Sequence, residues 1–201
     1  MVATNNAGKL AEFRRLLSPA PVDLVSPAEA GLDLIVDEDG LTFLANAQKK
    51  AREYAGAAGL PALADDSGLV VRALGGRPGV DTASYGGPGL DAAGRYQLLL
   101  RELDGEPDRR AEFVCVLALA RPRGPAAHVF VGRAEGRIGR HPVGTGGFGY
   151  DPVFVLPDGR SMAELTASEK DTLSHRGRAV AEMFAQFDLG RWARGEGTPE
   201  R

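Results

Sequence analysis

Segments with the periodicity of strands and segments with the periodicity of helices alternate along most of this 201-residue chain. Residues 61–64 form a short apolar run typical of a buried strand, and residues 42–58 repeat apolar side chains at helical spacing. Two longer runs, at 111–120 and 126–136, predict strands that pair as a hairpin through residues 122–125. The alternation predicts a mixed α/β fold.

Other segments extend this pattern. Residues 1–3 and 22–25 predict two short strands, and a helix follows the polar turn after the first of them. Residues 92–103 predict another helix, and Ser174 is placed to cap the N-terminus of a last one. We expect a single two-lobed domain over residues 1–190 and a flexible polar tail over residues 191–201.

Charge and cysteine content exclude several classes of protein. The chain has 24 basic and 27 acidic residues, a formal net charge of -3, and no long basic run, so we expect no nucleic-acid partner. Cys115 is the only cysteine, which rules out an internal disulfide and a cysteine-rich zinc site. No apolar stretch approaches the ~18 residues of a membrane span, and no signal peptide is evident. We therefore expect a cytoplasmic protein that does not bind membranes.

A polar turn near the N-terminus has the composition of a phosphate site. Residues 4–9 read Thr-Asn-Asn-Ala-Gly-Lys and lead into a helix. Backbone N–H groups at a helix N-terminus bind anions, and Lys9 adds a positive charge. The turn is not a Walker A sequence, so an ordinary turn with a solvated lysine is the alternative.

Two adjacent carboxylates follow residues 61–64. We expect the strand to end in a turn at Asp65-Asp66-Ser67-Gly68, where both carboxylates can reach one magnesium ion and one can take a proton from water. A plain turn, with aspartate accepting backbone N–H bonds, is the alternative. Glu38, in an acidic loop before a helix, is either a third carboxylate of this site or a helix-dipole partner.

Residues late in the chain suit a planar base. Phe148 lies between two glycines, which leave its ring open to stacking. Ser174-His175-Arg176 offers hydrogen-bond donors at a helix start, although a capping serine with surface His and Arg is the alternative. Lys50 aligns with Thr42 and Asn46 on one helix face. For both Lys50 and Lys170, the alternative to a role in the site is an ordinary exposed surface lysine.

Taken in order, five motifs closely resemble the Ham1-like family of inosine/xanthosine triphosphate pyrophosphatases. They are residues 4–9, Gly40-Leu41-Thr42-Phe43, residues 64–69, residues 144–151 and Ser174-His175-Arg176-Gly177. The resemblance runs from the first residues to about Phe187. It implies an elongated mixed sheet with helices that form two lobes around a central nucleotide-binding cleft, and a homodimer.

The resemblance also implies an activity. Members of this family hydrolyse ITP, dITP and XTP, with Mg²⁺, to the monophosphate and pyrophosphate, and so cleanse the nucleotide pool of deaminated purines. Asp66 matches the catalytic general base, and the expected metal residues are Glu38, Asp66 and Asp65. The expected substrate contacts are Thr4, Asn5, Asn6, Ala7, Gly8, Lys9, Lys50, Ser67, Phe148, Gly149, Tyr150, Asp151, Lys170, His175 and Arg176.

Two alternatives to this assignment remain, and departures from the family pattern leave one of them, a non-catalytic protein, open. Ser84 replaces the arginine of a Ser-Ala-Arg-Tyr run, Ala45 replaces a common glutamate, and Arg72 and Asp81 also differ. A non-catalytic nucleotide sensor is one alternative, against which the Asp65-Asp66 pair argues. A Maf-like pyrophosphatase of modified pyrimidine nucleotides, with a related fold, is the other, against which the loop around Phe148 and the Ser174-His175-Arg176 turn argue. The first strand is also short for the family, which suggests a start further upstream.

Overall fold

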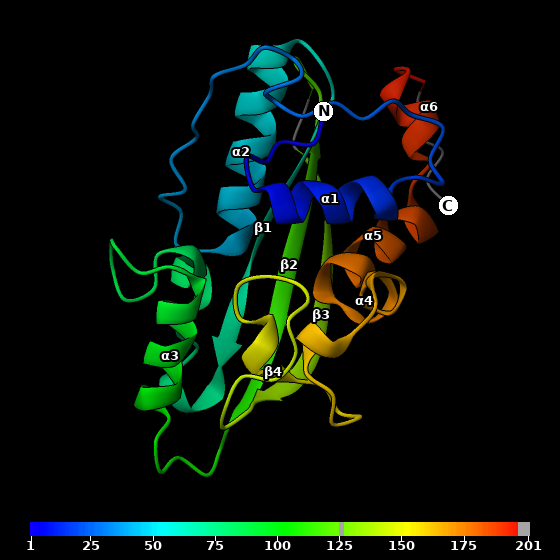
Figure 1. The fold of residues 1–201 in the computed structure, drawn as a ribbon. Coiled ribbons are helices and arrows are strands. Elements are labelled where there is room, and N and C mark those ends of the chain that lie inside the picture. Colours follow the sequence, from blue (N-terminus) through cyan, green and yellow to red (C-terminus); the bar gives the residue numbers. More distant parts are fainter. Residues whose placement is uncertain (125–126, 197–201) are drawn as a thin grey trace. The chain divides into compact units, whose positions relative to one another are not determined.

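The computed structural model describes residues 1–124 and 127–196 and has an α/β fold, as predicted (Figure 1). Its α-helices are α1 (Ala7–Leu16), α2 (Phe43–Ala58), α3 (Ala92–Glu102), α4 (Ala167–Leu173), α5 (His175–Gln186) and α6 (Leu189–Ala193). Its strands are β1 (Ala62–Val71), β2 (Arg110–Ala120), β3 (His128–Ile138) and β4 (Phe154–Val155). The strands form one sheet in the order β1-β2-β3-β4, and β4 is antiparallel to β3.

The chain divides into two compact units. The first unit consists of the described residues of Met1–Asp66, Cys115–Gly132 and Arg176–Arg201. The second unit consists of Ser67–Val114 and Arg133–His175. Each of β1, β2 and β3 contributes residues to both units.

Each unit has a hydrophobic cluster of its own. In the first unit, Phe13 of α1, Leu117 of β2 and Met183 of α5 are buried together with the thiol of Cys115. A cluster in the second unit likewise packs α3 against its strands, with Leu99, Ile138, Phe113 and Phe154 among its members. The rings of Phe113 and Phe154 lie 4.5 Å apart between centroids. Burial of these side chains is the main stabilising contribution in each unit.

Helix α2 forms where its sequence pattern predicts it. The Thr42 side chain accepts a hydrogen bond from the backbone N–H of Ala45 at 3.1 Å and caps its N-terminus, and Gly59 ends it in the left-handed conformation. Ala47 and Ala51 are fully buried and leave room for close packing. None of the helices in residues 1–124 and 127–196 combines the length and the apolar character needed to cross a membrane.

The turn predicted at residues 65–68 is wrong, because β1 continues through it without a break from Ala62 to Val71. The apolar runs on both sides of the two aspartates belong to this one strand, and β1 lies beside β2 in the sheet. Pairing within the sheet outweighs the local preference of Asp, Ser and Gly for turns. Asp65 and Asp66 therefore lie on extended backbone.

The two short strands predicted near the N-terminus are also wrong. Val2 makes only an isolated parallel bridge with Leu63, and residues 22–25 are not a strand. The N–H of Val2 instead donates to the carbonyl of Val25 at 2.8 Å. The bridge itself consists of the bonds from the N–H of Ala3 to the carbonyl of Leu63 and from the N–H of Leu63 to the carbonyl of Met1, so the backbone groups are satisfied without a longer ladder.

The predicted domain boundary at residue 190 falls inside α6, because this helix continues to Ala193. Trp192 is only 4% exposed and belongs to the cluster of the first unit. The ring centroids of Trp192 and Phe187 lie 5.7 Å apart, and Cζ of the Arg121 guanidinium lies over the Trp192 ring, 5.0 Å from its centroid. Residue 125 of the predicted hairpin connection, residue 126 of the predicted strand after it, and residues 197–201 of the predicted tail lie outside the described residues.

We expect the Trp192→Ala variant to lose about 3 kcal/mol of unfolding free energy, because it removes a large buried ring from this cluster. Arg191→Ala is the matched control, since the Arg191 side chain is half exposed and pairs with Glu196 at the surface. Urea denaturation of the two variants measures the difference. Equal, small losses in both would contradict a packed C-terminal helix.

Candidate active site

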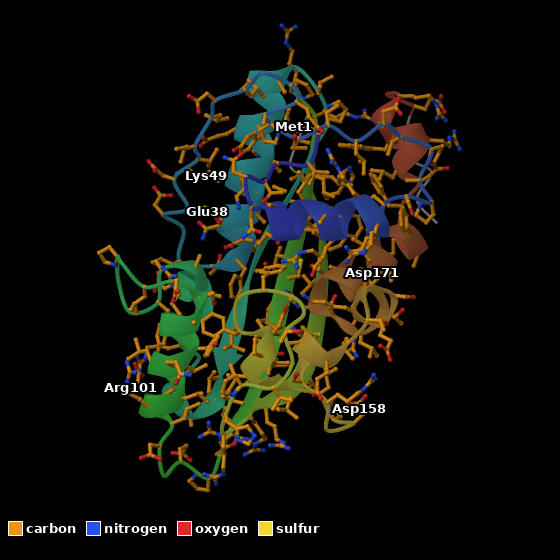
Figure 2. The ribbon with its side chains drawn as sticks, in the orientation of Figure 1. Met1, Glu38, Lys49, Arg101, Asp158 and Asp171 are labelled. Carbon is orange, nitrogen blue, oxygen red and sulfur yellow. The ribbon has the colours of Figure 1, made fainter. Side chains whose placement is uncertain are left out.

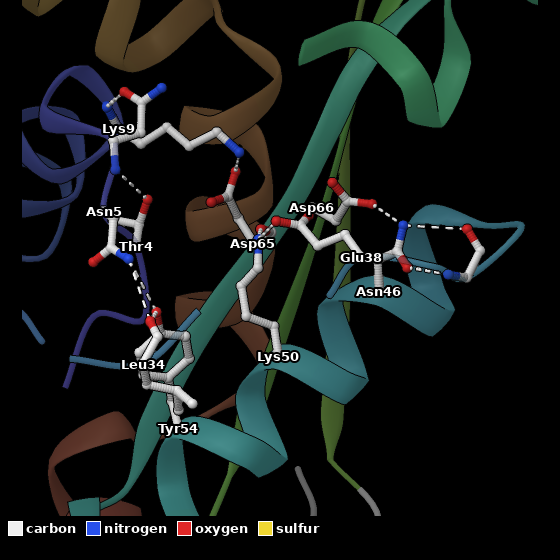
Figure 3. Close-up of polar contacts among 12 residues, drawn as sticks. Thr4, Asn5, Lys9, Leu34, Glu38, Asn46, Lys50, Tyr54, Asp65 and Asp66 are labelled. Carbon is white, nitrogen blue, oxygen red and sulfur yellow. Dashed lines mark hydrogen bonds and ion pairs between the residues drawn. The ribbon is translucent and has the colours of Figure 1, made fainter. Parts of the chain in front are cut away.

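The two consecutive aspartates of β1 lie in separate surroundings. Neighbouring side chains on an extended strand point to opposite faces, so the carboxylates of Asp65 and Asp66 point in different directions, unlike those of two aspartates at one turn. Both are buried, with 1% and 5% of their surface exposed. Burial of a carboxylate is costly unless cations or hydrogen-bond donors surround it. Figure 3 shows the side chains that the first unit places around this pair.

Asp65 is surrounded by cations. Its Oδ2 atom lies 3.0 Å from Nζ of Lys9 and 3.2 Å from Nη2 of Arg176, and the backbone carbonyl of Asp65 accepts a hydrogen bond from Nζ of Lys50 at 3.0 Å. Burial by itself raises the pKa of the Asp65 carboxyl, but Lys9, Arg176 and Lys50 reverse this and hold the pKa well below its ordinary value. Asp65 therefore stays ionised and holds Lys9 in place.

Arg176 is a buried member of this network rather than a surface residue. It is 1% exposed, pairs with Glu12 as well as Asp65, and lies 5.6 Å above the Phe13 ring. Burial opposes its charge, but the nearby negative groups, Asp65 first among them, raise the pKa of its guanidinium. We predicted Arg176 beside a base together with His175, whereas the structure places its guanidinium among the carboxylates of the first unit.

Asp66 has the properties of a general base. Its Oδ2 accepts a hydrogen bond from Nδ2 of Asn46 at 3.1 Å. Burial raises the pKa of Asp66 to about 6, and the negative charge of Glu38 acts in the same direction, while the bond from Asn46 and the charges of Lys9 and Lys50 limit the rise. A carboxylate with a pKa near 6 is ionised at neutral pH yet basic enough to accept a proton.

Lys50 links Glu38 to β1. Its Nζ lies 2.8 Å from Oε1 of Glu38 and also donates to the carbonyl of Asp65. Burial lowers the pKa of Lys50, but the charges of Asp65 and Glu38 more than offset this and raise it. Figure 2 shows Glu38 on the segment ahead of α2, where its carboxylate is accessible to solvent. Lys50 was predicted only as a phosphate contact, and the structure shows that it also fixes Glu38.

The predicted phosphate turn leads into α1 as expected. Asn6 caps this helix by accepting the N–H of Lys9 at 3.1 Å, and Thr4 Oγ1 accepts the N–H of Asn6 at 3.2 Å. Asn5 Nδ2 donates to the hydroxyl of Tyr54 at 3.3 Å and so ties the turn to α2. The turn, which also includes Ala7 and Gly8, therefore has a fixed backbone at a helix N-terminus, which is a favourable place for an anion.

In the second unit, Asp151 organises the loop that carries Phe148. Its Oδ2 accepts hydrogen bonds from the backbone N–H of Phe148 at 2.8 Å and from Nζ of Lys170 at 2.6 Å. The ammonium of Lys170 also lies 4.7 Å from the centre of the Phe148 ring. Gly147 has a φ of 69° and no room for a side chain, because a Cβ there would clash with Asp151. This loop therefore requires glycine.

The other predicted contacts of the second unit lie around this loop, on β1 and at the start of α5. The hydroxyl of Tyr150 donates to the carbonyl of Thr82 at 3.1 Å, and Gly149 has a φ of 63°. The ring of His175 is buried and stacks on that of Phe113, with centroids 4.7 Å apart. Ser67 lies on β1 and is partly exposed.

The carboxylates of the first unit fit a divalent cation that is also bound by phosphate. Within the part of the chain that the structure describes, no three His, Cys, Asp or Glu residues gather closely enough to hold a metal alone. Glu38 and Asp66 repel one another, which raises the pKa of Asp66, and a cation between them would relieve this repulsion. Magnesium commonly binds through one or two carboxylates together with substrate phosphates. Asp65 fits this less well, because it already pairs with two protein cations.

Sequence reasoning missed two members of the site. Glu12 partners Arg176, and its only sequence signal is a carboxylate next to Phe13 on the apolar face of α1. Asn46 bonds to Asp66, and its signal was its place one turn before Lys50 on the same helix face.

A family model and individual relatives both place this chain in the same protein family. The model of the Ham1 family matches residues 1–186. A protein of Syntrophobacter fumaroxidans named dITP/XTP pyrophosphatase is 47% identical over 189 residues, which cover 94% of this chain and 81% of the relative. A Shigella flexneri protein of the same name is 48% identical over 184 residues, which cover 90% of this chain and 93% of the relative.

Solved structures agree with this. A HAM1 protein from Coxiella burnetii superposes with a TM-score of 0.84 and 41% identity, over 92% of this chain and 95% of the other. A nucleoside-triphosphatase described as a dITP/XTP pyrophosphatase, from Mycobacterium abscessus, has a TM-score of 0.72 and 47% identity, over 90% and 95% of the two chains.

We expect the metal-free Asp66→Asn variant to be more stable than the wild type at pH 7.5, by on the order of 1–3 kcal/mol. The folded-state pKa of about 6 exceeds the ordinary value of 3.8, so the ionised carboxylate destabilises the folded state above about pH 6. The substitution removes that charge and keeps an oxygen for the bond from Asn46. Urea denaturation in EDTA measures the gain.

At pH 4 the gain should shrink, because the wild-type carboxyl is then largely protonated in the folded state. Asp158→Asn is the control, since Asp158 pairs with Arg160 in an exposed turn. A gain that persisted unchanged at pH 4 would contradict the raised pKa.

Proposed function

The chain belongs to the Ham1 family, and on that premise we propose that it hydrolyses dITP, ITP and XTP to the nucleoside monophosphate and pyrophosphate. Relatives named dITP/XTP pyrophosphatase that are 47% and 48% identical over nearly its whole length support the substrate class. The observation that carries the chemistry is Asp66, a buried carboxylate with a pKa of about 6. Such an activity would remove deaminated purine nucleotides from the pool.

Asp66 is the general base of this reaction. It accepts a proton from a water molecule while the water oxygen forms a bond to the α phosphorus. The bond between that phosphorus and the oxygen bridging to the β phosphate breaks, and pyrophosphate leaves with the electron pair. The ionised state of Asp66 at neutral pH and its hydrogen bond from Asn46 suit it to this role.

Lys9 and Lys50 stabilise the charge of the polyphosphate. Both are ammonium groups held at β1, Lys9 by the side chain of Asp65 and Lys50 by its backbone carbonyl. Because these positions are set before substrate arrives, little reorganisation is needed as negative charge moves to the leaving pyrophosphate. In this scheme Asp65 positions Lys9 and is not a direct metal ligand, which revises our expectation from the sequence.

Mg²⁺ is the proposed cofactor, held by Glu38 and Asp66 together with the phosphates of the substrate. When bound, such an ion neutralises phosphate charge and lowers the pKa of a coordinated water molecule. Glu38 suits this role because its carboxylate is accessible and is oriented by Lys50.

The second unit supplies the residues proposed to select the base. Phe148 offers a ring for stacking, and Lys170 is held beside it by Asp151. Hydrogen-bond donors such as Lys170 and His175 favour the 6-oxo group of hypoxanthine and xanthine, which accepts hydrogen bonds. The 6-amino group of adenine is itself a donor and cannot accept these bonds, so adenine is disfavoured. We further propose a cytoplasmic homodimer, as the family resemblance suggests.

We expect the wild-type protein to release pyrophosphate from ITP, dITP and XTP in preference to GTP and ATP, when assayed with Mg²⁺. The Asp66→Asn variant should lose about 100- to 10,000-fold in kcat, because an amide cannot accept the proton. Asp158→Asn, at an exposed turn labelled in Figure 2, should keep wild-type activity. Binding of ITP without hydrolysis by the wild type would instead establish a nucleotide sensor, and preference for pyrimidine nucleotides a Maf-like activity.

The Phe148→Ala variant should show the opposite kinetic pattern. Loss of stacking on the base should raise KM for ITP by roughly 5- to 100-fold and change kcat much less. Steady-state kinetics with ITP at saturating Mg²⁺ measures the two constants. A large fall in kcat with an unchanged KM would contradict a role for this ring in base binding.

A further inference from the structure

Asn46, on α2, makes three hydrogen bonds from a nearly fully buried side chain. It is 2% exposed. Its Oδ1 accepts the backbone N–H of Gly40 at 2.7 Å, and its Nδ2 donates to the carbonyl of Gly40 at 3.3 Å and to Oδ2 of Asp66 at 3.1 Å. The bonds can be followed in Figure 3.

These partners determine the orientation of the amide. The N–H of Gly40 needs an acceptor, whereas the carbonyl of Gly40 and the carboxylate of Asp66 each need a donor. A flipped amide would direct its oxygen at two other oxygens and its NH₂ group at an N–H. The Asn46 side chain therefore fits this place in one orientation only, with both of its N–H groups used.

Gly40 is shaped to receive this side chain. A Cβ at position 40 would lie 2.5 Å from Oδ1 of Asn46 and 2.9 Å from the Cβ of Ala45. Any other residue at this position would push the loop away from α2. The absence of a side chain at Gly40 is thus a condition for the paired bonds to Asn46.

Asn46 connects the two carboxylates proposed to act in the reaction. Gly40 lies two residues after Glu38, so its paired bonds fix the end of the segment that carries Glu38. The third bond orients the carboxylate of Asp66. One turn further along α2, Lys50 holds Glu38 itself. Two side chains of one helix face therefore set the positions of both carboxylates.

We propose that Asn46 is a positioning residue for hydrolysis: it fastens the Glu38 segment to α2 and holds the Asp66 carboxylate in its working orientation. The inference rests on the proposed function. Asn46 does not take part in bond making, and acts through Gly40 and Asp66.

Two substitutions break this arrangement from opposite sides. Asn46→Ala removes the side chain that makes the bonds, and Gly40→Ala displaces the loop that receives them. We expect each to lower kcat for ITP by about 10- to 100-fold, as loss of residues that orient metal-binding groups does, and to change KM less than about threefold at saturating Mg²⁺. The Mg²⁺ concentration for half-maximal activity should rise in both.

Thr42→Ala is the matched control, because Thr42 caps the same end of α2 by accepting the N–H of Ala45, whereas the bonds to Gly40 and Asp66 come from Asn46. It should lower the melting temperature while kcat and the Mg²⁺ dependence stay near wild type. If Asn46→Ala and Thr42→Ala lose stability and kcat to the same extent, Asn46 is only structural and the inference is overturned.

A readout independent of turnover is the exchange of the Gly40 amide proton in the metal-free protein. It should exchange faster in Asn46→Ala, because its acceptor is gone, while amides in the middle of α2 stay protected. The Asn46→Asp variant distinguishes the bond to the Gly40 N–H from the bond to the Asp66 carboxylate. Its carboxylate still accepts the Gly40 N–H but faces Asp66 with a like charge, so Gly40 should stay protected while kcat still falls about 10-fold or more.

Asn46→Asp also serves if Asn46→Ala does not fold, since it preserves the shape of the side chain. Full kcat in a folded Asn46→Asp or Gly40→Ala variant, beside an active wild type, overturns this inference and leaves the proposed function standing. A wild type that releases no pyrophosphate from ITP, dITP or XTP overturns both.

Discussion

Burial of two consecutive carboxylates on an extended strand is the constraint on which the first unit depends. Each buried aspartate requires compensation, and because adjacent strand residues face opposite sides, Asp65 pairs directly with Lys9 and Arg176 whereas Asp66 accepts a bond from Asn46. Burial raises the pKa of both carboxyls, but at Asp65 the cations Lys9, Arg176 and Lys50 reverse this and the pKa falls. At Asp66 burial, together with the negative charge of Glu38, outweighs the bond from Asn46 and the charges of Lys9 and Lys50, so the pKa rises. Two residues of the same type thereby acquire opposite properties, a permanent anion and a base.

The surrounding elements supply these partners. α1 contributes Lys9, and α2 contributes Asn46 and Lys50 from one face. Each of these side chains has both a structural role and a proposed role in the reaction. Each stabilises a buried carboxylate and at the same time fixes a group proposed to act on phosphate. This explains why the charged side chains proposed to carry out the chemistry are more buried than charged residues usually are.

The second unit uses the same principle with one carboxylate. Asp151 is buried and is compensated by the Phe148 N–H and by Lys170. The compensation places an aromatic ring and an ammonium group side by side, which is an arrangement suited to a planar, carbonyl-bearing ligand. In both units the functional geometry follows from the need to satisfy a buried aspartate.

The sequence by itself determined the α/β class, the position of α2, the order of the motifs and the residue types available for phosphate, metal and base. It did not determine that residues 65–68 continue a strand or that Arg176 forms ion pairs with Glu12 and Asp65. Nor did it determine that Asn46 forms hydrogen bonds with both Gly40 and Asp66. Those features depend on segments far apart in the chain. Local patterns encode the preference of a backbone for helix, strand or turn, whereas the partner of a buried charge is decided only when folding brings distant donors within hydrogen-bond reach.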